Sequence, residues 1–330
     1  MRAGGAGASR LVPRRFSGSS LSPLAPCEPF MHALISLPVL MVILAGLFLA
    51  GLGLSYKMAA VNRCRPMAFS VVFLLVATVL AGGRALCEAT AWENPRLWAL
   101  GGVMGVLSFG SLVLFVQVNT LGPASVSWTM LNLSLLVPIL LAPFVLGESF
   151  RALDGVLIVL FLLIVVVLQR GMRGAAEDVK SRSRAFWPLL AAVFLMNGAF
   201  QFGAKLKDTL FHEGSAAGLA TLYFGSGLLL AVLTHAAQTR SLRFTAREWG
   251  VGLLAGGCAG FGNLLFLNGM SLPTVVAFPL TQGIALVGGV ALTTVVYAER
   301  LNPAKIIGFL LSLAVLMLAV LRDPLQRWLR

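Results

Sequence analysis

The sequence predicts an all-α membrane protein of ten transmembrane helices, arranged as two inverted five-helix repeats. The composition is 58% hydrophobic and only 11% charged, against about 25% charged residues in soluble domains. Apolar runs of about 20 residues, long enough to cross a bilayer as helices, follow one another along the chain. The stretch 119–170 recurs in outline at 268–322. A repeat of membrane-length segments with a period of about 150 residues is typical of transporters.

Ten apolar stretches have the length and composition of membrane spans. Short connections containing Pro, Asn or charged residues separate them, and proline ends helices because it lacks an amide hydrogen and restricts the residue before it. The longest polar connection, Arg170 to Arg184, divides the spans into two groups of five. The predicted spans are 33–55, 67–87, 97–118, 123–146, 153–169, 186–206, 216–237, 249–268, 274–297 and 304–321.

Each group of five spans is one copy of a repeat. An odd number of crossings makes consecutive copies enter the membrane with opposite orientation, so a pseudo-two-fold axis in the membrane plane is expected to relate them. Equivalent residues can be paired, for example Pro123 with Pro273. The predicted organisation is a first repeat at 31–170, a linker at 171–184, a second repeat at 185–322 and a tail at 323–330.

Residues 1–30 differ from the rest of the chain. They are rich in Arg, Ser, Gly and Pro and contain no acid before Glu28, a composition that predicts a disordered tail. The tail is either an organelle transit peptide or an over-long translation start, with Met31 as the true first residue. The predicted location is the bacterial inner (plasma) membrane, or an organelle membrane if the tail is a transit peptide.

The net charge of +13 does not indicate nucleic-acid binding. The Lys and Arg residues stand in short groups between apolar runs, where charges flanking membrane spans are expected. They are more numerous after the odd-numbered spans, which by the positive-inside rule favours both termini outside. The four cysteines have neither metal-ligand nor disulfide-framework spacing, so no metal and no cofactor is expected. They are Cys27, Cys64, Cys87 and Cys258.

Each copy of the repeat closes one apolar span with an acid, turns through a few polar residues and ends in another apolar span. The acids stand in Gly147-Glu148 and Ala298-Glu299, and spans one and six end near Lys57 and Lys205. This pattern, over residues 33–321, resembles the EamA family of the drug/metabolite transporter superfamily. The resemblance implies a ten-helix carrier with a central cavity and cytoplasmic termini. This orientation is opposite to the one that the distribution of Lys and Arg favours. The first span lacks the Trp-Gly pair that commonly precedes the lysine in this family.

Polar side chains within the spans indicate where a solute pathway would run, because an unpartnered polar group in hydrocarbon is costly. Asn132 and Gln282 stand alone in apolar runs at equivalent positions of the two copies. Each follows a bulky ring by four residues, Trp128 or Phe278, and this placement favours binding. The other candidates for the cavity are Gln117, Asn197, Gln201, Asn263, Lys57 and Lys205.

Alternatives remain open for several of these residues. Asn197, Gln201 and Lys205 recur every four residues on one helical face, which suits a cavity wall or helix-to-helix hydrogen bonding worth about 0.6 kcal/mol in a bilayer. The two lysines are expected either at the cavity mouth, attracting an anion, or extended to the membrane interface. Structural or gate roles are expected for Glu148, Glu299, Pro138 and Pro279, with surface ion pairs to Arg151 and Arg300 as the alternative for the acids.

The predicted function is a carrier that moves a small metabolite by alternating access, through exchange or facilitated transport. No Asp or Glu lies in the middle of a span, so a buried carboxylate relay for proton coupling is not visible. A channel or a non-transporting assembly protein is the alternative. A membrane enzyme fits less well, because no acid/base or metal constellation is found. The expected partners are a small-molecule substrate and the lipid bilayer, with the substrate and oligomeric state open.

Overall fold

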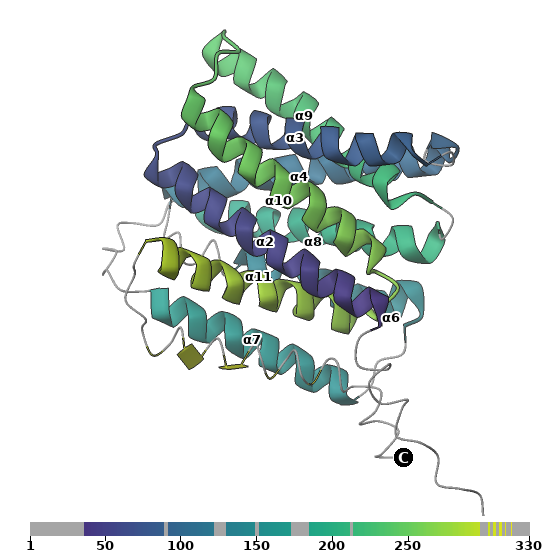
Figure 1. Cartoon of the computed structure of the whole chain (residues 1–330). Helices are drawn as coiled ribbons and strands as arrows, with labels where there is room; N and C mark the ends of the chain where they lie inside the picture. The colour runs from purple at the N-terminus through teal and green to yellow at the C-terminus, as the bar shows by residue number, and fades with distance from the viewer. Residues whose placement is uncertain are drawn as a thin grey trace, which may run out of the picture. The chain divides into compact units, whose positions relative to one another are not determined.

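The structure is a computed structural model that describes residues 36–88, 92–121, 130–148, 152–172, 185–211, 214–297 and isolated positions between 303 and 318. No strand occurs among these residues. The predicted tail at 1–30, most of the linker and much of the tenth span lie outside them. The helices, drawn in Figure 1, are α2 (Leu37–Val61), α3 (Pro66–Leu86), α4 (Pro95–Leu121), α6 (Leu136–Leu146), α7 (Ala152–Met172), α8 (Phe186–Leu210), α9 (Ala216–Thr239), α10 (Ala246–Asn268) and α11 (Thr274–Val296).

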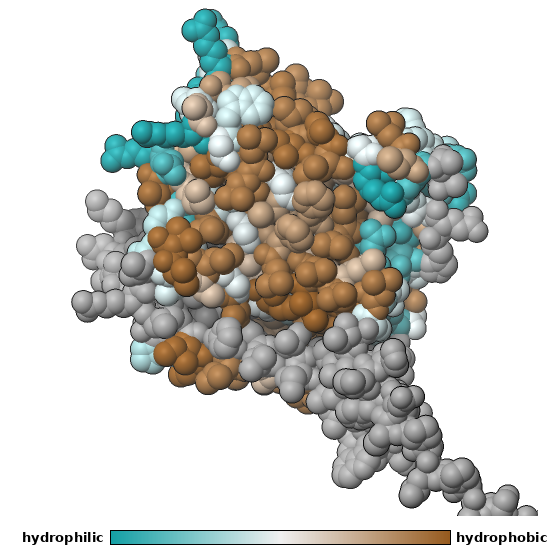
Figure 2. All heavy atoms as spheres, in the orientation of Figure 1, coloured by the Kyte–Doolittle hydropathy of each residue, from teal (hydrophilic) through white to brown (hydrophobic). Residues whose placement is uncertain are grey.

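Seven of the described helices are long and apolar enough to cross a membrane, namely α2, α3, α4, α8, α9, α10 and α11. Shorter apolar helices cover Met130–Leu146 and Leu153–Leu163. Large apolar side chains such as Leu47, Leu195 and Phe261 are about half exposed. Figure 2 shows apolar side chains over most of one face and hydrophilic ones at its margins. Such an apolar exterior requires lipid around it, so the chain is an integral membrane protein.

Two helices run further than the sequence predicts. The first span is predicted to end at residue 55 and the sixth at residue 206, whereas α2 continues to Val61 and α8 to Leu210. Neither extension contains Pro or Gly, so nothing in the backbone ends the helix at the lysine. Lys57 and Lys205 therefore lie within helices rather than at their ends.

The predicted fourth span is interrupted by a turn at Ser134 and Leu135. Pro138 offers no amide hydrogen to the carbonyl oxygen of Ser134, which accepts from the Val137 amide at 3.0 Å instead. The Leu135 amide bonds the carbonyl oxygen of Asn132 at 3.3 Å, so the carbonyl of the preceding residue, Leu131, is left to side chains. Pro138 thus lies next to a break in the helix, whereas Pro279 lies inside the continuous helix α11.

Helices of the first half pack mainly against helices of the second half. Helix α2 contacts α10 and α11, α3 contacts α9 and α10, and α4 contacts α8 and α9. Helix α6 lies against α8, and α7 lies against α11, as Figure 1 also shows for α7. The core of buried apolar residues extends over α2, α3, α4, α8, α9 and α10. The two halves therefore enclose a common interior.

Glycines allow two of these interhelical contacts to be close. A Cβ atom added at Gly252 or Gly256 of α10 would lie 2.5 Å from a side-chain atom of Val72 or Val76 of α3. On α4, a Cβ at Gly101 would lie 2.4 Å from Leu222 of α9. These distances are shorter than van der Waals contact, so α10 and α4 can approach their neighbours only because the glycines have no side chain.

Replacing Gly256 by Ala is expected to destabilise the fold by about 1–3 kcal/mol, because the new methyl group overpacks the α3–α10 contact. Gly257 on the same helix provides the control, since a Cβ there meets no atom within 4 Å. Gly257→Ala should be neutral, or stabilising by up to about 1 kcal/mol through helix propensity. The midpoint of thermal unfolding in detergent measures both. Equal midpoints for the two variants would contradict the close approach.

Candidate functional site

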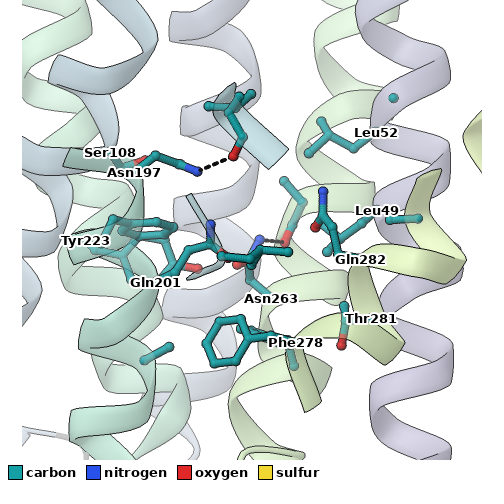
Figure 3. A pocket seen from close by; sticks show the side chains of 18 of the residues that line it. Leu49, Leu52, Ser108, Asn197, Gln201, Tyr223, Asn263, Phe278, Thr281 and Gln282 are labelled. Atoms are coloured by element: carbon teal, nitrogen blue, oxygen red, sulfur yellow. Dashed lines mark hydrogen bonds between the residues drawn. The ribbon is translucent and has the colours of Figure 1, made fainter. Parts of the chain in front are cut away.

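A cavity of about 330 Å³ lies between the helices of the two halves. Its wall contains side chains from α2, α3, α4, α8, α9, α10, α11 and the stretch 131–135. The sequence predicts a site between spans 1, 3, 4, 6, 8 and 9; the wall includes residues of all six, and α3 and α9 add to it. Figure 3 shows Asn197, Gln201, Asn263 and Gln282 around the same space. The volume is at the lower end of the range of small-molecule sites.

The structure brings five of the predicted candidates to this wall, namely Asn132, Asn197, Gln201, Asn263 and Gln282. Three others lie elsewhere among the described residues. Gln117 is exposed near the end of α4, and neither Lys57 nor Lys205 belongs to the described wall. Trp128 and Glu299 lie outside the described residues.

Asn132 and Gln282 meet directly. The Gln282 side-chain amide donates from Nε2 to Oδ1 of Asn132 at 3.0 Å. Asn132 is only 4% exposed and lies just before the break in the fourth span, whereas Gln282 lies in the middle of α11. A hydrogen bond between one residue from each half of the chain therefore lies in the cavity wall.

The polar face of α8 is held by the broken fourth span. Asn197 donates from Nδ2 to Ser134 Oγ at 2.6 Å and to the carbonyl oxygen of Leu131 at 3.4 Å. Gln201 donates to the same Ser134 Oγ at 3.3 Å. Ser134 Oγ in turn donates to the Leu131 carbonyl at 2.6 Å. The break near Pro138 thus supplies the carbonyl and the hydroxyl that orient both amides.

Aromatic rings form the apolar part of the wall, and apart from Phe278 the sequence does not single them out. Phe200 lies edge-on to Tyr223 with ring centroids 5.4 Å apart, and Phe266 meets Phe278 in the same way at 5.3 Å. Tyr56 packs against Phe73 at 6.5 Å. Aromatic residues are common in membrane helices, so only a position on the same helical face as an amide, as for Phe200 three residues after Asn197, could have indicated them.

Lys205 lies within the second half of α8, in a group of interactions that we call the Lys205 cluster. Its Nζ atom is 2.9 Å from Oε1 of Glu148 and donates to the carbonyl oxygens of Met270 and Leu272 at 3.0 Å each. Oε2 of Glu148 accepts from the Thr274 amide at 3.0 Å. The three ammonium hydrogens therefore have three protein acceptors, and the side chain, 6% exposed, neither faces the cavity nor extends to the interface.

The Lys205 cluster ties together three parts of the fold. Glu148 follows α6, Lys205 belongs to α8, and Met270 to Thr274 connect α10 with the first turn of α11. A carboxylate at the amino end of α11 also interacts favourably with the helix dipole. The end of the helix bundle that carries Lys205, Glu148 and Thr274, here called the Glu148 face, is therefore closed by polar contacts.

The opposite end has its own interhelical ion pair. The Arg65 guanidinium lies 2.8 Å from Oε1 of Glu248, and Glu248 also completes a capping box with Thr245 at the start of α10. The hydrogen bond to Glu248 raises the pKa of Arg65, so this pair stays charged at any physiological pH. Lys57 lies towards this end, with Nζ 4.8 Å from the ring centre of Tyr297.

Charge is absent from the described wall of the cavity. Its polar groups are amides, hydroxyls and phenols, and no Lys, Arg, Asp or Glu is among them. Across the described part of the chain, no three His, Cys, Asp or Glu side chains are close enough to hold a metal ion. What the site offers a ligand is hydrogen bonding and aromatic surface.

Comparison with known proteins extends to the fold alone. No protein-family model and no curated protein matches the sequence. A solved structure described as "Crystal structure of protein" matches with a TM-score of 0.72 at 18% sequence identity, covering 86% of this chain and 96% of that chain. The helical arrangement therefore exists in a second protein of nearly the same extent.

Proposed function

We propose that the protein is a membrane carrier that moves a small solute by alternating access between two inverted five-helix repeats. The observation that carries the proposal is the cavity between the two halves, where Asn132 of one copy and Gln282 of the other are hydrogen-bonded at 3.0 Å. A solute between them would contact both halves at once. Transporter sites are typically found at the interface of such repeats, near the middle of the membrane.

The helix contacts support the repeat. A two-fold axis between the copies would exchange α2 with α8, α3 with α9, α4 with α10 and α6 with α11. Under this exchange the contact α2–α11 becomes α8–α6, α2–α10 becomes α8–α4, and α3–α10 becomes α9–α4. All six pairs are in contact, and α3–α9 converts into itself. The glycine contacts follow the same exchange, since α10 approaches α3 through Gly256 and α4 approaches α9 through Gly101. This is the pattern expected of two copies related by a two-fold axis.

The Lys205 cluster supports a gate at the Glu148 face. It joins α8, the end of α6 and the connection before α11, and these helices also contribute to or adjoin the cavity wall. Separating them would open the cavity at that face. Exchanging the two copies converts Lys205 and Glu148 into Lys57 and Glu299, so the sequence offers the same two residue types for a second gate, as expected of a rocking mechanism. With no acid on the described wall, exchange or facilitated movement is proposed.

Alternating access is tested by thiol labelling from the two sides of the membrane. Ser108 lines the cavity and is close in size to cysteine, so Ser108→Cys is the reporter in a chain whose four native cysteines are replaced. Two native cysteines, restored one at a time, report which way the protein is inserted in the membrane. Exposed Cys87 lies next to the Glu148 face, and Cys64 lies at the other end. An impermeant maleimide should label the reporter from both faces of the membrane. The double variant Lys205→Met with Glu148→Gln should be labelled faster from the Glu148 face and more slowly from the opposite face.

A fixed pore gives a different result in this experiment. The reporter in a fixed pore would be labelled from both faces, and the double substitution would not change the ratio of the two labelling rates. Labelling from one face alone, in both backgrounds, would also contradict the proposed carrier.

A further inference from the structure

The neighbours of three cavity amides determine which atom each amide presents. Asn263 Nδ2 lies 2.9 Å from the backbone carbonyl oxygen of Ala259, which can only accept. Ser134 Oγ gives its single hydrogen to the Leu131 carbonyl, so it can only accept from Asn197 and Gln201. In all three side chains the NH₂ group is therefore oriented by a protein acceptor: both hydrogens of Asn197 and one hydrogen each of Gln201 and Asn263 are engaged.

The carbonyl oxygens of these amides have no protein donor in the described part of the chain, so the free acceptors of the three amides outnumber their two remaining N–H hydrogens. No donor among the described residues bonds Oδ1 of Asn197, Oε1 of Gln201 or Oδ1 of Asn263, and all three residues line the cavity. Each such oxygen has two lone pairs. A cavity with several free acceptors and no basic side chain favours a solute that carries N–H donors.

The residues of the cavity wall also indicate the charge of the solute. An anion would lose its water without meeting any Lys or Arg, because no basic residue is among the described lining and Lys205 has its three hydrogens engaged elsewhere. A cation would meet carbonyl oxygens and aromatic faces but no carboxylate. Taking a charge out of water costs more than cation–π contacts return, so an uncharged solute fits best.

We propose that the cavity binds an uncharged aromatic or heteroaromatic solute with N–H donors, such as a ring that carries a carboxamide or an amino group. The rings of Phe200, Tyr223, Phe266 and Phe278 would pack against its flat faces. The acceptors on Asn197, Gln201 and Asn263 would bind its N–H groups. The inference rests on the proposed carrier function for its physiological meaning, whereas the binding itself can be measured without transport.

Three probes of nearly the same shape separate the possibilities. Benzamide is uncharged, benzoate is an anion and benzamidinium is a cation at pH 7. Nicotinamide and nicotinate form a second matched pair. The full chain, purified in detergent, is heated with each probe at equal concentration, and the shift in unfolding midpoint gives the relative affinity. The expected order is benzamide above benzamidinium, with no shift from benzoate, and nicotinamide above nicotinate.

A pair of substitutions on one helix tests whether the probe binds in the cavity. Asn263 and Asn268 both lie in α10, and each donates from Nδ2 to the carbonyl oxygen four residues earlier. Only Asn263 lines the cavity, whereas Asn268 is exposed. Asn263→Leu should weaken benzamide binding about tenfold, the loss of one good hydrogen bond. Asn268→Leu should bind benzamide as the unchanged protein does.

The inference is overturned if benzoate or benzamidinium binds at least as well as benzamide, or if neither uncharged probe shifts the midpoint. Benzamide binding that Asn263→Leu leaves unchanged also overturns it. Failure of the carrier function looks different. Benzamide that binds through Asn263, in a protein that shows no solute exchange, supports the ligand chemistry and refutes transport. Exchange of anions alone supports transport and refutes the ligand chemistry.

Discussion

Replacing Lys205 by Met is expected to destabilise the folded protein by about 3–5 kcal/mol, the usual cost of removing one member of a buried ion pair. The Glu148 carboxyl group, in a side chain only 21% exposed, would lose its ammonium partner and retain the Thr274 amide as its described partner. The carbonyl oxygens of Met270 and Leu272 would also lose their donor. The midpoint of thermal or chemical unfolding in detergent measures the loss.

Two further variants show whether the ion pair is the cause. Lys205→Met combined with Glu148→Gln should recover much of the lost stability, because the Glu148 charge is removed together with its closest cation, while the longer 3.7 Å pair of Lys205 with Asp208 is lost in both variants. Arg84→Met removes one member of an exposed pair, in which Arg84 lies 3.2 Å from Glu88 and is 61% exposed. That change should cost no more than about 1 kcal/mol. A Lys205→Met variant as stable as Arg84→Met would show that the Lys205 cluster does not hold the Glu148 face together.

Replacing Asn132 or Gln282 by Ala is expected to reduce transport about tenfold or more, while the protein still inserts into the membrane and purifies intact. The two amides bond each other at 3.0 Å on the cavity wall, so either substitution leaves the other amide without this partner and alters the site in both halves. Because they act as a pair, the double variant should lose little more than either single variant.

Uptake into proteoliposomes, scaled to the amount of inserted protein, measures this effect. Asn268→Ala is the matched control, since it removes an exposed amide that bonds only within α10 and should leave uptake unchanged. Full uptake by both Asn132→Ala and Gln282→Ala would remove the pair from the substrate site.

Five of the six amides predicted for the cavity lie on its described wall, and the reason is physical. A polar residue such as Asn132 or Gln282 inside a membrane span needs a partner or water, so its position in an apolar run is itself informative. Their equivalent places in the two predicted copies also indicate that they lie near each other. The hydrogen bond between them could not be predicted, because it depends on the bend that follows the break near Pro138.

Other parts of the site could not be derived from sequence patterns. Lys205 was expected at a helix end, yet α8 continues beyond it and buries it. Its partner Glu148 is predicted to have a structural or gate role, with a surface ion pair to Arg151 as the alternative. The packing of α6 on α8 brings Glu148 to Lys205, a pairing that the sequence does not indicate. Ion pairs between distant segments depend on helix rotation and depth, which local composition does not encode.

The number of spans shows the same limit. Nine of the ten predicted spans correspond to described helices, although seven of these are long and apolar enough by themselves to cross a membrane. Hydropathy locates an apolar run reliably, because only helices and closed barrels satisfy their backbone in lipid. It does not register the break at Ser134 and Leu135, where side chains replace the missing backbone hydrogen bonds.

Solute counterflow in proteoliposomes tests the carrier most directly. Liposomes containing the purified protein are loaded with one member of a metabolite panel, and uptake of the same labelled compound is compared with uptake into empty liposomes. A carrier that alternates between two faces predicts faster uptake into loaded liposomes for at least one compound, and loss of that acceleration in Asn132→Ala and Gln282→Ala. Equal uptake into loaded and empty liposomes would indicate a channel, and chemical conversion of the label an enzyme; either result would contradict the account.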